Sequence, residues 1–281
     1  TSTTGSIGTA LQNPNLSYAD SNLPDNTDVL SVGGYVKLDG GGAITLDSQA
    51  YTQNESSSTL SIPLTVADNN NRILIVAVGG YNANPVVSSM TWNGDSFTEI
   101  ATANSNANAG LWHLVAPSIG SYDVDITYSS GTSTMSGAGV YSFYNVDQSN
   151  PIGVTASYDA TSQATNPSQT ITPTTTGSII VDSITHISGV GTTLVDSHTA
   201  GWSQSMNLPT HDQRKQGSQY DLTPTIGSAN TMGWTTSQAA YTNWVGAEIH
   251  AVPEPNTKLL GLNDVTFNVG TTSASVTGET N

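Results

Sequence analysis

The chain contains no cysteine and few basic residues, and both shortages limit what it can be. Without cysteine it has neither a disulfide framework nor a thiolate metal site. Lysine and arginine together number 5, against 21 aspartates and glutamates, which gives a net charge of −16 at pH 7. Nucleic acids and anionic membrane surfaces are bound through clustered basic residues, so we expect neither as a partner.

Long apolar runs and strong helix formers are also scarce. No apolar run approaches the roughly 18 residues of a membrane-spanning helix, and apolar residues never keep a helical period across three turns. The chain begins at Thr1 and is rich in uncharged polar residues, as exported surface proteins often are. We therefore expect a processed, extracellular or cell-surface protein, without a membrane span. Two Asn-x-Ser triplets make Asn15 and Asn54 candidate glycosylation sites.

Short alternating apolar stretches fill the middle of the chain. Residues 60–66 alternate, with Pro63 on the opposite parity, and a proline in a strand favours the edge of a sheet. Residues 73–78 are apolar on both parities, which predicts a central strand covered on both faces. The Asn93-Gly94 pair predicts a tight hairpin with a type I′ turn.

Many such strands, separated by Gly, Asn, Ser and Pro turns, predict an all-β fold. We expect an antiparallel two-sheet sandwich, jelly-roll-like in its connections. No break in composition occurs between residues 44 and 252, so we expect one sandwich domain over residues 29–252. No repeat of fixed period is apparent. An extended polar N-terminal arm at 1–28 would precede it, and a proline hinge with a C-terminal tail strand at 253–281 would follow it.

A pattern of strands and turns runs through several quoted stretches of the chain. They are residues 71–79 (NRILIVAVG), 87–94 (VSSMTWNG), 111–117 (LWHLVAP), 139–143 (GVYSF), 146–148 (VDQ) and 244–247 (WVGA). Together they resemble a β-sandwich domain that recurs in secreted bacterial and archaeal surface proteins. The resemblance covers roughly residues 70–250 and implies a structural or accessory module, because none of the matched positions carries a known catalytic role.

No group of residues specifies a reaction, so we expect no enzymatic activity. Gly94-Asp-Ser96 is similar to the nucleophile block of GDSL-type esterases, but Ser96 follows a hairpin turn and no Asp-x-x-His block supplies a base. Glu248 and His250 share one strand parity with Trp244, and this face could form a small catalytic or sugar-binding patch. A solvated or loop-covered face is the bland alternative, and hydrolase activity is a third-ranked function.

We expect no cofactor, with calcium as the alternative. Hard cations prefer oxygen ligands, which occur at Asp68-Asn-Asn-Asn71 and around Asp123 and Asp125.

The segment beyond the proline hinge predicts how subunits would join. Apolar residues alternate with polar ones there, and such a strand can complete the edge of a neighbouring sheet. A head-to-tail contact of this kind does not close on itself, so it produces a filament. We expect a pilus-like homopolymer joined by donor-strand exchange, with an inter-subunit strand formed by Leu260, Leu262, Val265, Phe267 and Val269.

Two alternatives to this hypothesis stay open. The tail strand could fold back onto its own domain. The protein could instead be a carbohydrate-binding or adhesin module with surface glycans as partners, and its candidate glycan-binding aromatics are Trp202, Trp234 and Trp244.

Overall fold

The structure, a computed structural model, is all-β, as the sequence predicts. It describes residues 42–54, 57–81, 87–105, 107–129, 136–160, 162–163, 165–187, 194–196, 202–208 and 214–253, with two short strands at 16–18 and 274–276. Within these residues no helix is long and apolar enough to cross a membrane. Backbone contacts divide the chain into a unit over Gly40–Glu254 and a second unit formed by Thr1–Asp39 with Pro255–Asn281.

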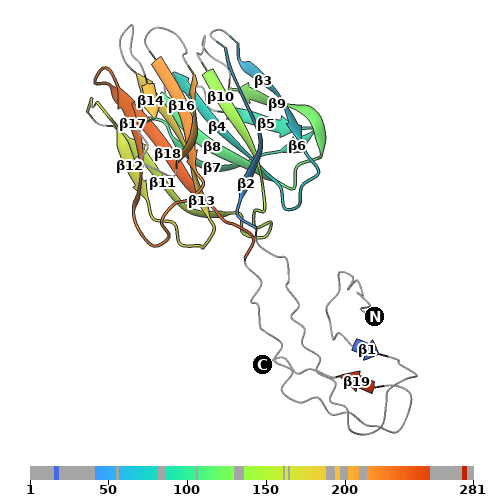
Figure 1. Cartoon of the computed structure of the whole chain (residues 1–281). Coiled ribbons are helices and arrows are strands. Elements are labelled where there is room, and N and C mark those ends of the chain that lie inside the picture. The colour runs from blue at the N-terminus through green and yellow to red at the C-terminus, as the bar shows by residue number, and fades with distance from the viewer. Residues whose placement is uncertain are drawn as a thin grey trace. The chain divides into compact units, whose positions relative to one another are not determined.

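The first half of the larger unit is a sandwich of two antiparallel sheets (Figure 1). Apart from two hairpins, successive strands pass from one sheet to the other around the core, which is the winding of a jelly roll. The five-stranded sheet has the order β2 (Thr45–Asn54), β10 (Ser136–Tyr144), β4 (Ile73–Tyr81), β8 (Ala107–Val115), β7 (Thr98–Ala103). The four-stranded sheet has the order β3 (Thr59–Val66), β9 (Gly120–Tyr128), β5 (Val87–Trp92), β6 (Asp95–Ser96).

The second half repeats this topology strand for strand. Its five-stranded sheet has the order β11 (Ile152–Asp159), β18 (Tyr241–Ile249), β13 (Ile179–Ile187), β16 (Arg214–Asp221), β15 (Trp202–Leu208). Its smaller sheet has the order β12 (Ser168–Ile171), β17 (Asn230–Thr236), β14 (Leu194–Asp196). Matched in chain order, the two large sheets are identical in strand order, and the small sheets differ by the short β6.

The match extends to individual residues. The cross-strand row Leu46, Phe143, Ile73 of the first sandwich corresponds to the row Ile152, Ile249, Ile179 of the second. Each residue of the second row follows its counterpart by the same number of positions. The turn into β9 reads Pro-Ser-Ile-Gly-Ser and the turn into β17 reads Pro-Thr-Ile-Gly-Ser, with positive φ at Gly120 and Gly227.

The larger unit is therefore two copies of one jelly roll. The sandwich fold is confirmed, but the expectation of a single two-sheet sandwich without an internal repeat is wrong. Outside the repeated turn the two copies have diverged, so the duplication is evident in the topology rather than in residue identities.

The four sheets stack as four layers, with the two five-stranded sheets in the middle (Figure 1). Three apolar cores separate the layers: one inside each sandwich and one between the large sheets. In β4, Ile75 packs into the core between the sandwiches, whereas Leu74 and Val76 pack into the core of the first sandwich. This double coverage explains the run that is apolar on both parities, and it confirms the prediction of a central strand there.

Two further local predictions are confirmed. Pro63 lies in β3, which is the edge strand of the four-stranded sheet. Asn93 and Gly94 have φ values of 47° and 89° between the paired residues Trp92 and Asp95, as the hairpin prediction required.

The edge strands of the large sheets all carry irregularities. The pairing of β2, β7, β11 and β15 with their neighbours is interrupted in each case by a shift of register. Such bulges twist an edge and interrupt its ladder of hydrogen bonds, so a bulged edge is a poor template for a further strand. The edges of the two large sheets are thus guarded against simple edge-to-edge association.

Both ends of the larger unit are held at one residue. Asn145, which has a positive φ of 65°, donates from Nδ2 to the carbonyl oxygen of Ala43 at 3.1 Å. Its own carbonyl oxygen accepts from the backbone N–H of Val252 at 3.0 Å. An isolated bridge between Val146 and Ala251 reinforces this junction. The chain therefore enters and leaves the double sandwich at the same place.

The smaller unit contains one antiparallel pair of strands. Strand β1 (Leu16–Tyr18), from the N-terminal arm, pairs with β19 (Ala274–Val276), from the tail, and Leu16 lies opposite Val276. The predicted inter-subunit strand, Leu260, Leu262, Val265, Phe267 and Val269, lies outside the described residues, as does Asn15.

Candidate functional site

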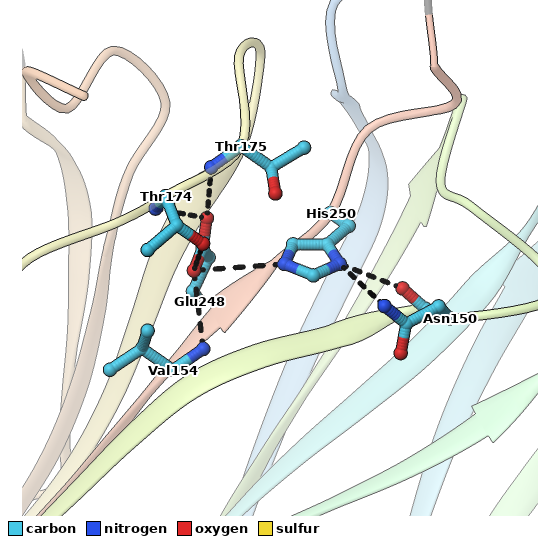
Figure 2. A network of polar contacts seen from close by, with 6 residues as sticks. All are labelled: Asn150, Val154, Thr174, Thr175, Glu248 and His250. Atoms are coloured by element: carbon cyan, nitrogen blue, oxygen red, sulfur yellow. Dashed lines mark hydrogen bonds and ion pairs between the residues drawn. The ribbon is translucent and has the colours of Figure 1, made fainter. Parts of the chain in front are cut away.

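Two acid-containing clusters in the second sandwich are the candidates for chemistry, and the first is centred on Glu248. This residue lies near the end of β18, and the side chain is completely buried. His250 follows two positions later and is 8% exposed. The β12–β13 loop and the start of β11 approach the same point, so three segments that are distant in the sequence meet around one carboxylate (Figure 2).

Backbone N–H groups dominate the contacts of the Glu248 carboxylate. Oε1 accepts from the backbone N–H of Thr174 at 2.8 Å and of Thr175 at 2.9 Å. Oε2 accepts from the backbone N–H of Val154 at 3.1 Å and from the Thr174 hydroxyl at 3.3 Å. The carboxylate therefore ties the β12–β13 loop and β11 to β18 through donors that hold fixed positions.

These donors also decide the protonation state of the carboxylate. Burial alone would raise the pKa of Glu248, but the N–H groups of Thr175, Val154 and Thr174, with the Ser178 hydroxyl, hold it below the ordinary 4.5. A general acid needs a raised pKa near the working pH. Glu248 has the opposite shift and no exposed surface, so its environment suits a permanent anion that organises loops.

His250 lies between Asn150 and Glu248, but these three residues do not form a catalytic triad. Its Nδ1 lies 2.9 Å from the carbonyl oxygen of Asn150, and its Nε2 lies 3.6 Å from Oε2 of Glu248 (Figure 2). Activation of a hydroxyl nucleophile requires one imidazole nitrogen to face the hydroxyl while the other is oriented by an acid. In His250 the two nitrogens face Asn150 and Glu248, so the arrangement supports the loop-covered alternative.

The first sandwich solves the same structural problem with a carboxylate on a different strand. Oδ2 of Asp47 accepts from the backbone N–H of Ala67 at 3.0 Å and from the Ser142 hydroxyl at 3.1 Å. By register, Ser142 is the counterpart of Glu248, and Asp47 is the counterpart of Gly153. One acid per sandwich, buried at Glu248 and partly buried at Asp47, thus holds the loop between the second and third strands, which favours a structural role for Glu248.

Gly153 occupies the position at which the first sandwich has Asp47, and it yields a testable prediction. A Cβ placed at Gly153 would lie 2.5 Å from Oε2 of Glu248 and would also overlap the His250 ring. Gly153→Ala should therefore lower the free energy of unfolding by about 1–3 kcal/mol, measured by urea denaturation.

A double-mutant cycle with Glu248→Ala provides the control for Gly153→Ala. Glu248→Ala removes one of the two side chains that the new methyl group meets, so the cost of Gly153→Ala should shrink in that background. An equal cost in both backgrounds would contradict this explanation.

The second cluster is centred on Asp182, which is buried in the middle of β13. Its Oδ2 accepts from Nε1 of Trp234 at 3.0 Å, Nε1 of Trp244 at 2.9 Å and Nε2 of Gln219 at 2.9 Å. Its Oδ1 accepts from the backbone N–H of Gln219 at 3.0 Å. Burial raises the pKa of Asp182 to about 6, against the opposing effect of these four donors.

The first sandwich has no polar group at this position. Val76 pairs with Val140 and Trp112 there, whereas Asp182 pairs with Gly246 and Gln219. The Val76 row belongs to an apolar core. The fold itself therefore does not require an acid here. Sequence reasoning missed Asp182, although a charged residue inside the apolar run Ile-Ile-Val-Asp was a usable signal.

The two tryptophans bonded to Asp182 were expected as glycan-binding aromatics. Trp234 is 0% exposed and Trp244 is 1% exposed. The expectation is corrected for both residues, because each indole N–H is committed to a buried carboxylate and neither ring reaches the surface. Trp202 lies in β15 and Asn54 ends β2, but their side chains fall outside the described part of the structure.

The other residues singled out by the sequence are spread over the first sandwich. Ser96 lies exposed in the β5–β6 hairpin, away from any histidine contact that the structure describes. Asp123 and Asp125 both accept from the Ser61 hydroxyl at 2.8 Å on the exposed face of β9. Asp68 lies 3.8 Å from Arg72. Among the described residues, no group of three or more acidic, histidine or cysteine side chains is arranged to hold a metal ion.

Comparisons with known proteins indicate no family for the chain. No family model, no curated protein and no solved structure matches it.

Proposed function

We propose that the protein is a non-catalytic structural subunit of an extracellular, filament-like assembly, in which the double sandwich is a rigid body and the terminal segments join subunits. The pairing of β1 with β19 carries this proposal. One strand comes from each end of the chain, and the two are complementary in register. The same pair can form between the arm of one subunit and the tail of the next, which is the logic of domain swapping.

Two features of the larger unit support terminal segments as the joint. The described core residues are well covered, with Ile62, Phe143 and Ile184 fully buried, so within the described part of the structure no core is left open to a neighbour's strand. The large sheets also have bulged edges, which discourage strand addition. Exchange between arm and tail is therefore favoured over insertion of the tail into a sandwich.

The proposal predicts the behaviour of proline variants in the full-length chain. Proline cannot donate to a ladder and disrupts a three-residue strand, so Ser275→Pro in β19 and Ser17→Pro in β1 should each abolish assembly. Light scattering after size exclusion and negative-stain imaging would report the loss. The matched variants Ser275→Ala and Ser17→Ala should assemble like the parent chain.

Mixing the two proline variants separates exchange from folding back. The Ser17→Pro chain keeps an intact tail and the Ser275→Pro chain keeps an intact arm, so a mixture should form heterodimers that grow no further. A parent chain that stays monomeric at every concentration would refute the proposal. Polymers that persist in both proline variants would place the joint elsewhere.

A further inference from the structure

His250 lies where the chain leaves the double sandwich. Its backbone N–H donates to the carbonyl oxygen of Pro151 at 2.9 Å. Two residues later, the backbone N–H of Val252 donates to the carbonyl oxygen of Asn145 at 3.0 Å. Residues 250–252, which we call the exit segment, are therefore held by the turn between β10 and β11, and the tail begins directly beyond them.

A hydrogen bond to Asn150 decides which nitrogen of the neutral His250 ring carries the proton. Nδ1 lies 2.9 Å from the backbone carbonyl oxygen of Asn150, which can only accept, so Nδ1 must donate (Figure 2). The side-chain amide of Asn150 is 3.5 Å from the same nitrogen and is too distant to compete. Nε2 of a neutral ring is therefore an acceptor without a proton.

This acceptor faces a second acceptor. Nε2 lies 3.6 Å from Oε2 of Glu248 and has no hydrogen-bond partner among the residues that the structure describes. The side chain of Glu248 is fully buried and that of His250 is 10% exposed, so water screens their contact only weakly. Two lone pairs meet when the ring is neutral, whereas a protonated ring forms an ion pair with the carboxylate.

The charged groups around the ring favour its protonated form. Glu248 approaches from the same strand, and Asp147 lies in the turn between β10 and β11. The pKa of Asp147 is held below its ordinary 3.8, mainly by the Ser149 hydroxyl and to a smaller degree by the nearby His250. The groups that β11, the β12–β13 loop and β13 bring to the Glu248 carboxylate are uncharged, and they belong to Val154, Thr174, Thr175 and Ser178.

The duplication shows that the fold does not require this pair. By register, Ser142 and Tyr144 of the first sandwich are the counterparts of Glu248 and His250. The chain continues from Tyr144 into the second sandwich, whereas it continues from His250 into the tail. The acid and the imidazole therefore occur only in the copy of this strand from which the tail leaves.

We propose that His250 and Glu248 form a pH-dependent anchor of the exit segment. At acidic pH the protonated ring bridges the carbonyl oxygen of Asn150 and the buried carboxylate, and it holds the segment closed. As the pH rises through the range in which histidine titrates, Nε2 loses its proton, its contact with Glu248 becomes repulsive and the segment opens more often. Only the consequence for assembly rests on the proposed function: a tail that joins subunits would be held more firmly in acid.

Amide hydrogen exchange of the Ser275→Pro chain at about pH 5 and about pH 8, on either side of the histidine range, tests this proposal. Rates are divided by the intrinsic exchange rate at each pH. Between the two pH values, protection of the Val252 amide should fall at least about tenfold more with His250 present than in His250→Gln, because a charge-assisted contact is lost. Glu248→Gln should also reduce the pH dependence, because its amide can donate to a neutral ring.

His113→Gln is the matched control, since it makes the same change at a partly buried histidine of β8 in the first sandwich. It should leave the pH dependence of the exit segment intact. Any effect of pH on global unfolding, including that of Asp182, is common to the compared chains and cancels. The proposal is overturned if His250→Gln keeps the full pH dependence, or if His113→Gln removes as much of it. The readout is local to the exit segment, so it holds whether or not the terminal strands join subunits.

Discussion

Replacement of Asp182 by alanine should lower the free energy of unfolding by about 3–5 kcal/mol at pH 7. The change would leave the indole N–H groups of Trp234 and Trp244 and two N–H groups of Gln219 without their buried acceptor. Each unsatisfied buried donor costs about 1–3 kcal/mol, and the relief of burying a charge offsets only part of the sum. Urea denaturation followed by near-ultraviolet circular dichroism would measure the loss.

The matched controls for Asp182→Ala are an exposed acid and the equivalent residue of the other sandwich. Asp95→Ala in the exposed hairpin should change stability by less than about 0.5 kcal/mol. Val76→Ala removes a buried side chain at the equivalent position but leaves no hydrogen-bond donor without its acceptor. It should therefore cost less than Asp182→Ala. Equal losses at Val76 and Asp182 would contradict the importance of the hydrogen bonds.

Asp182 also predicts how stability depends on pH. Its pKa in the folded protein is about 6, against 3.8 for an ordinary aspartate, so the folded state binds the proton more readily. Its contribution therefore becomes less favourable as pH rises from about 4 to about 6, by about 3 kcal/mol in total. Asp182→Asn should remove this dependence, as unfolding measured between pH 4 and pH 7 would show.

The second large effect is expected at Glu248. Glu248→Ala should cost at least about 3 kcal/mol, because the backbone N–H groups of Val154, Thr174 and Thr175 would lose a buried acceptor. The β12–β13 loop should then open more often, and limited proteolysis should cleave it there first. Glu248→Gln keeps one carbonyl oxygen without the charge, so its loss should be smaller than that of alanine.

Acid should act on Glu248 in the direction opposite to Asp182. The pKa of Glu248 is held below 4.5, so its contribution is present above that pH and is lost as the pH falls through the folded-state value. The two acids together predict greatest stability at about pH 4 to 4.5, where Asp182 is still protonated in the folded protein and Glu248 is still ionised. Loss of stability below pH 4.5 that is equally steep in Glu248→Gln would show that another group is responsible.

Single strands were predictable because the pattern of apolar residues in each strand reflects which of its faces are buried. The alternation in residues 60–66 reports one covered face, and the continuous apolar run at 73–78 reports two. The Asn93-Gly94 turn was equally legible, since few residue pairs accept positive φ at both positions. Fold class and edge position therefore followed from local patterns.

The duplication and the polar clusters could not be read in the same way. Equivalent positions hold Val76 and Asp182 in one case and Asp47 and Gly153 in another, so the repeat is conserved in register while its chemistry changes. Partners such as Gln219 and Asp182 are distant in sequence and meet only through pairing of β13 with β16. Trp234 and Trp244 were expected at the surface because the sequence alone does not show which strands cover them.

The junction at Asn145 has a mechanical consequence for a filament held by its arm and tail. Ala43 and Val252 both bond to this asparagine, so tension arriving along one terminal segment leaves along the other within a few ångströms. The four stacked sheets then carry little of the tension, because the load passes from one terminal segment to the other without crossing them. Pulling would peel β2 and β18 from their ends, one hydrogen bond after another, instead of shearing whole sheets at once.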